Sequence, residues 1–141
     1  MLGKNILIVE SRYYEDVASM LLDATVSEIN KYKYNYKTID VHGALEIPIL
    51  ISKAIKENKY DGFIALGCVI RGETSHYDIV SEISANYLLK LSTKYVVPIT
   101  NGILTVNNKQ QALYRADKNQ KNHGGHAAKA CIKLINSFRL V

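Results

Sequence analysis

The 141-residue sequence has no tryptophan, only two cysteines and two prolines, and fewer acidic than basic residues, 13 against 18. Two cysteines exclude a disulfide-rich scaffold, and because Cys68 and Cys131 stand in apolar patterns, we expect two buried thiols. No apolar run approaches the length of a membrane span. Residues 1–4 lead directly into the first expected strand, without a signal peptide. These absences predict a cytoplasmic protein, built as a single domain over residues 1–141.

The basic residues are unevenly distributed along the chain. From residue 107 to the end there are seven lysines and arginines against the single acid Asp117, which leaves the preceding part nearly neutral. A basic cluster of this kind suits phosphate, on a small metabolite or on a nucleic acid. His123 and His126 of this cluster stand three residues apart, but no carboxylate or thiolate completes a metal site with them, so no metal is expected. The cluster lies in an expected polar connection and comprises Arg115, Lys118, Lys121, His123 and His126.

Strand-like apolar runs alternate with helical patterns along the chain. Such alternation is typical of an α/β fold in which helices cover both faces of a parallel sheet. We expect strands at 5–10, 36–41, 63–66 and 96–104. We expect helices that begin near Tyr13 and Pro48, a third over 80–91, and two more at 108–116 and 127–138.

The most informative stretch runs from Gly67 to Asp78 and reads GCVIRGETSHYD. It separates a buried strand from a helix, and it therefore predicts a loop at the carboxyl end of a strand, where ligands bind in α/β sheets. Gly72 lets the backbone approach a ligand closely, and the free N–H groups of residues 73–75 would bind an anion at the start of the helix. His76 is the group of this loop that titrates near neutral pH.

Three further loops are expected beside this one, because the carboxyl ends of parallel strands meet at one edge of a sheet. The four loops are Ser11–Tyr14, His42–Glu46, Gly67–His76 and Asn101–Thr105.

The polar and aromatic residues of these loops also have plainer interpretations. Thr74 or Ser75 could only cap a helix, with His76 a surface histidine. Glu46 could be a carboxylate at a helix start or a ligand contact. Tyr13 could pack on its own helix or cover a planar substrate.

Two motifs resemble those of the lumazine synthase family. They are Val69–Asp78 (VIRGETSHYD) and Gly43–Pro48 (GALEIP). Further points of resemblance occur in the family's order and at its spacing across nearly the whole chain: Ser11–Tyr13, Gly102–Thr105, and Arg115-Ala116 followed by Asn122 and Gly124.

The resemblance implies a flavodoxin-like three-layer α/β sandwich with a central four-stranded parallel sheet, assembled as a homopentamer or a multiple of it. It implies a transferase of riboflavin biosynthesis that condenses 5-amino-6-(D-ribitylamino)uracil with 3,4-dihydroxy-2-butanone 4-phosphate. The products would be 6,7-dimethyl-8-ribityllumazine, phosphate and water. The resemblance implies no organic cofactor and no metal, and neither nucleic acid nor a membrane as a partner.

The resemblance also assigns roles to residues of this sequence. His76 would be catalytic and shuttle protons during imine formation and phosphate loss. Tyr13 would stack on the pyrimidine, and residues 72–74 would hold the phosphate together with Arg115 of a neighbouring subunit. The substrate-binding residues implied are Tyr13, Ala44, Leu45, Glu46, Val69, Ile70, Gly72, Glu73, Thr74, Asn101, Arg115 and His123.

Three positions depart from the family's pattern. Tyr13 stands where many relatives carry Phe or Trp, Asn101 where some carry an aromatic ring, and His123 where a substrate-contacting Lys is common. The charge of a histidine depends on pH, whereas that of a lysine does not. Two rival classes stay open: a nucleic-acid-binding domain that uses the basic cluster, and a shell-forming subunit without turnover.

Overall fold

Four parallel strands form one sheet, in the order β2-β1-β3-β4, in a computed structural model that describes residues 4–141. The expectation that residues 1–3 lead into the first strand lies outside the described residues. The strands are β1 (Asn5–Ser11), β2 (Asn35–Val41), β3 (Gly62–Ile70) and β4 (Ile99–Val106). The helices are α1 (Glu15–Lys31), a 3-10 turn η1 (Ala44–Glu46), α2 (Ile47–Ile55), α3 (His76–Tyr95), α4 (Lys109–Ala116) and α5 (His123–Phe138).

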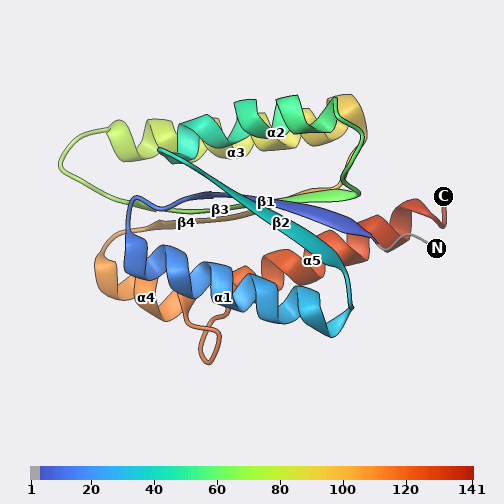
Figure 1. Cartoon of the computed structure of the whole chain (residues 1–141). Coiled ribbons are helices and arrows are strands. Elements are labelled where there is room, and N and C mark those ends of the chain that lie inside the picture. Colours follow the sequence, from blue (N-terminus) through green and yellow to red (C-terminus); the bar gives the residue numbers. More distant parts are fainter. Residues whose placement is uncertain (1–3) are drawn as a thin grey trace.

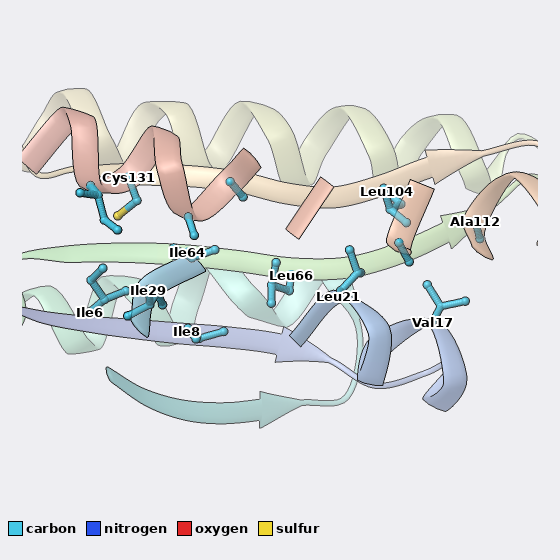
Figure 2. Close-up of a cluster of buried hydrophobic side chains, with 14 of the residues drawn as sticks. Ile6, Ile8, Val17, Leu21, Ile29, Ile64, Leu66, Leu104, Ala112 and Cys131 are labelled. Atoms are coloured by element: carbon cyan, nitrogen blue, oxygen red, sulfur yellow. The ribbon is translucent and has the colours of Figure 1, made fainter. Parts of the chain in front are cut away.

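The helices cover both faces of the sheet, which confirms the expected three-layer sandwich. Figure 1 shows α2 and α3 on one face and α1, α4 and α5 on the other. Successive residues of β1 point to opposite faces, so Ile6 and Ile8 belong to one core while Leu7 and Val9 belong to the other. The core under α1 and α5 is the larger of the two (Figure 2).

Two strand boundaries differ from the sequence prediction by three residues or more. β3 continues past Leu66 to Ile70, because its hydrogen-bonded partner β4 continues alongside it to Val106. β4 begins at Ile99 rather than Val96, because Val96 ends α3 in the left-handed region, with φ of 52°.

Residues 101–104 belong to the strand expected at 96–104, which β4 confirms there, and not to the loop expected at 101–105, because the chain turns only at Asn107 and Asn108. The last helix also begins earlier than expected, at His123. The Asn122 side chain caps α5, since it accepts a hydrogen bond from the N–H of Gly125 at 3.2 Å. His123 and His126 therefore stand on the first turns of α5 and not in a connection.

The two long helices α1 and α5 meet at a glycine. A Cβ atom on Gly124 would lie 2.4 Å from the carbonyl oxygen of Leu21 and 2.8 Å from the hydroxyl of Thr25. The buried Thr25 hydroxyl donates to the Leu21 carbonyl oxygen at 2.8 Å and lies 3.1 Å from that of Gly124. The start of α5 is thereby fixed against α1.

Gly124→Ala is therefore expected to lower the free energy of unfolding by about 1–3 kcal/mol, because the added methyl group forces the two helices apart. Gly72→Ala is the matched control, since a Cβ there meets no atom within 4 Å, and it should change stability by less than about 0.5 kcal/mol. Urea unfolding of both variants measures the difference. Equal free energies of unfolding for the two variants would show that the contact of Gly124 with α1 is not tight.

Candidate functional site

A cavity of about 380 Å³ opens at the carboxyl ends of β1, β2 and β3. Its walls come from the β1–α1 turn, the loop after β2, the end of β3 and the first turns of α3. Seven of the sequence-predicted site residues line it: Tyr13, Ala44, Leu45, Glu46, Val69, Ile70 and His76. The structure thus brings together residues from three separate segments, as the parallel sheet predicts.

One wall of the cavity is aromatic. Tyr13 precedes α1 and is 69% exposed, so it is not packed onto its own helix as the plainer interpretation required. Its ring meets that of Tyr14 edge to face, with ring centroids 5.0 Å apart. An exposed, laterally supported ring beside a cavity is suited to cover a planar ligand.

The opposite wall is formed by η1 between β2 and α2. Ala44 is buried, whereas Leu45 and Glu46 are exposed toward the cavity. Glu46 occupies the N-cap position of α2, as its plainer interpretation expected, but its side chain makes no capping hydrogen bond. The Glu46 carboxylate is therefore free to accept hydrogen bonds from hydroxyl groups of a ligand.

The back of the cavity is the end of β3. β1 pairs with β3 only as far as Glu10 opposite Leu66, so Val69 and Ile70 emerge without a strand on that side and are half-buried. His76, the first residue of α3, is exposed and lines the same cavity. An ionisable imidazole thus stands at the mouth of a mostly apolar pocket.

The loop between β3 and α3 carries the three residues proposed for phosphate, Gly72, Glu73 and Thr74, and all are exposed. Ser75 holds the N-cap position of α3 without a side-chain hydrogen bond, while the Thr74 hydroxyl accepts the N–H of His76 at 3.2 Å. In residues 4–141, the backbone N–H groups of Glu73, Thr74 and Ser75 have no acceptor. Such N–H groups at a helix start can bind an anion.

The remaining predicted residues lie elsewhere. Asn101 and His123 line a second, shallower hollow between the outer edge of β4 and α5. Burial is the main reason why the pKa of His123 is lowered, and the nearby Arg115, His126 and Lys121 lower it further by electrostatic repulsion. Arg115 on α4 is half-buried and belongs to this cationic group, since its charge acts on His123. One chain therefore carries the predicted site residues in two separate groups.

Several cavity residues were not predicted from the sequence, among them Ser11, Tyr14, His42 and Val80. The Ser11 hydroxyl donates to the carbonyl oxygen of His42 at 3.3 Å and joins two walls of the cavity. Ser11, Tyr14 and His42 nevertheless lie in the loops Ser11–Tyr14 and His42–Glu46 that the strand–helix alternation predicts at this edge of the sheet, so these loops gave the signal. Val80 belongs to the apolar pattern of the expected helix at 80–91, which indicates a core residue and not a cavity residue.

Cys131 is buried as expected, whereas Cys68 is only half-buried and lines the cavity. Its position at the end of β3 explains the difference, because no β1 residue covers it. Burial nevertheless raises the pKa of Cys68 to about 11 and that of Cys131 to about 12. Both side chains are therefore neutral thiols near pH 7.

In the described residues 4–141, no three His, Cys, Asp or Glu side chains are grouped to hold a metal ion. No helix of this part is both long and apolar enough to cross a membrane.

A four-stranded parallel sheet with a cavity at the carboxyl ends of its strands defines a flavodoxin-like ligand-binding domain. Comparison with known proteins specifies the family. The profile of the 6,7-dimethyl-8-ribityllumazine synthase family matches residues 3–139, nearly the whole chain. The chain belongs to this family.

Individual relatives agree with the family assignment. The 6,7-dimethyl-8-ribityllumazine synthase of Bartonella tribocorum is 49% identical over 133 residues, which cover 93% of this chain and 87% of the relative. That of Zymomonas mobilis is 49% identical over 130 residues, covering 92% and 93% of the two chains. That of Agrobacterium fabrum is 45% identical over 136 residues, covering 93% and 92%.

The raised pKa of both thiols predicts slow alkylation. With a pKa of about 11, only about one Cys68 in a thousand is a thiolate at pH 8, and the thiolate is the nucleophile. Iodoacetamide should modify the folded protein about a hundredfold more slowly than the unfolded protein, where the pKa is about 8.5. Mass spectrometry of the time course measures both rates. Rapid modification of Cys68 in the folded protein would contradict this environment.

Proposed function

We propose that the protein forms 6,7-dimethyl-8-ribityllumazine from 5-amino-6-(D-ribitylamino)uracil and 3,4-dihydroxy-2-butanone 4-phosphate, with release of phosphate and water. The observation that carries the proposal is the convergence of Tyr13, Glu46 and His76 on one cavity. The tyrosine ring would stack on the pyrimidine, and the carboxylate would bind ribityl hydroxyls. The histidine would move protons during imine formation and phosphate loss.

The reaction joins an amine to a ketone, and this step needs orientation above all. Holding two reactants in a productive geometry supplies roughly 7–11 kcal/mol of a barrier. The cavity walls hold the planar ring, while the exposed N–H groups of residues 73–75 are suited to hold the phosphate of the second substrate. His76 lies directly after these residues, so a proton donor and acceptor stands between the two binding regions.

We further propose that a complete site needs two neighbouring chains of a homopentamer. Asn101, Arg115 and His123 lie on the β4 side, apart from the cavity of their own chain. In a ring with head-to-tail contacts, these residues of one chain, with the charged Arg115 among them, would face the phosphate-binding loop of the next. The cytoplasm is the proposed compartment, because both cysteines are free thiols.

Nucleic acid is the less favoured partner for the basic cluster. Lys118 of this cluster pairs with Asp23 at 2.9 Å, and Lys129, which follows the cluster on α5, lies 4.0 Å from the buried Glu28. These acidic partners on α1 reduce the charge that could neutralise a nucleic-acid backbone.

Mixing both substrates with the purified protein is expected to produce the fluorescent lumazine. His76→Ala should lower turnover by roughly 10²-fold or less, because the bound reactants still combine slowly without a proton shuttle. Lumazine fluorescence measures the turnover of the wild-type protein and of the His76 variant between pH 6 and 8. An inactive wild-type protein would refute the proposed reaction, and an unchanged His76 variant would make this residue a surface histidine.

Arg115→Ala is expected to raise the apparent binding constant for butanone phosphate about ten- to hundredfold and to leave that for the uracil unchanged. A charge-assisted hydrogen bond is worth roughly 1.5–3 kcal/mol, and only the phosphate-bearing substrate would lose it. Lys118→Ala is the matched control, because its charge lies three residues away and is paired with Asp23. Equal weakening for both substrates would contradict the phosphate role of Arg115.

A further inference from the structure

Arg12 joins the end of β1 to the start of α1 through three separate hydrogen bonds. Its Nη1 donates to Oε1 of Glu10 at 2.7 Å, and its Nε donates to Oε2 of Glu15 at 2.9 Å. Its Nη2 donates to the hydroxyl of Ser19 at 2.5 Å. One guanidinium group therefore connects the end of β1 with the first two turns of α1.

Of the two ion pairs that Arg12 makes, the one with Glu10 is the more buried. The Glu10 side chain is 4% exposed, and Arg12 itself is largely covered, with 24% of its side chain exposed. Burial raises the pKa of Glu10, while the Arg12 guanidinium acts to lower it. Since a buried carboxylate is costly without a charged partner, the ion pair with Glu10 keeps the Arg12 guanidinium group at the end of β1.

Apart from Arg12, the turn is held by Tyr14, whose ring packs against the core and whose carbonyl oxygen accepts the N–H of Ala18 at 2.9 Å. Tyr14 occupies the N-cap position of α1, and no side chain caps the helix there. On the cavity side, the hydrogen bond from the Ser11 hydroxyl to the carbonyl oxygen of His42 ties the turn to the loop after β2. Tyr13, whose ring is proposed to stack on the pyrimidine, lies in the chain between Arg12 and its partner Glu15.

We propose that Arg12 is a positioning residue that fixes the orientation of Tyr13 over the cavity through its contacts with Glu10, Glu15 and Ser19. This inference rests on the proposed function, because it concerns binding of the uracil substrate. Arg12 does not line the cavity, so it acts through the backbone of the turn. A lysine cannot replace it, because an ammonium group lacks the planar fork that reaches three acceptors at once.

Arg12→Lys provides the test, because it keeps a positive charge beside Glu10 and therefore avoids an unpaired buried carboxylate. We expect the dissociation constant and KM for the ribitylaminouracil to rise about five- to tenfold, in the range of a lost aromatic contact. KM for the butanone phosphate should stay within about twofold, and the melting temperature should fall by less than about 4 °C. Arg139→Lys, at an exposed position on the opposite end of the chain, is the control for the chemical change.

A double-mutant cycle separates positioning from a general loss of structure. If Arg12 acts through Tyr13, adding Arg12→Lys to Tyr13→Ala should weaken uracil binding by less than about twofold further. The same five- to tenfold loss in both backgrounds, or equal weakening for both substrates, would overturn the inference. Calorimetric binding of the ribitylaminouracil gives this answer without turnover. Failure of the wild-type protein to form lumazine would instead count against the proposed function.

Discussion

Parallel pairing of β1 with β3 in the middle of the sheet is the constraint on which the site depends. Both strands are buried along their paired length, and their register places Glu10 opposite Leu66. β1 ends shortly afterwards, whereas β3 continues to Ile70 beside β4. This difference in length leaves the end of β3 uncovered on one side. The turn after β1 and the loop after β2 enclose the space that results.

The same topology separates the cavity from the cationic group. β3 lies between β1 and β4, so Asn101 on β4 faces the far edge of the sheet and not the cavity. The α4–α5 region adds Arg115 and His123 on that side. A single chain thus presents a pocket on one side and a cationic group on the other, an arrangement suited to completion by a second copy.

The sequence predicted the architecture because hydrophobic periodicity and the strand–helix alternation are local signals. It failed where tertiary contacts decide the outcome. The loop expected at 101–105 lies inside β4, because its pairing with β3 continues to Val106. Val96 favoured a strand by its branched side chain, yet it ends α3. The motifs located most of the cavity, whereas Ser11, Tyr14 and the Arg12 contacts depend on how the turn after β1 folds back on neighbouring segments.

Mixed assembly of two inactive variants tests most directly whether the site is shared between chains. In Gly72→Val the new side chain enters open space in the chain, so the variant should fold while its phosphate loop is blocked. Arg115→Glu reverses the charge of the other group. After joint unfolding and refolding, roughly a quarter of the interfaces in random rings would combine two unaltered halves and recover lumazine formation. Correctly assembled mixed rings without recovered activity would contradict a site shared between chains.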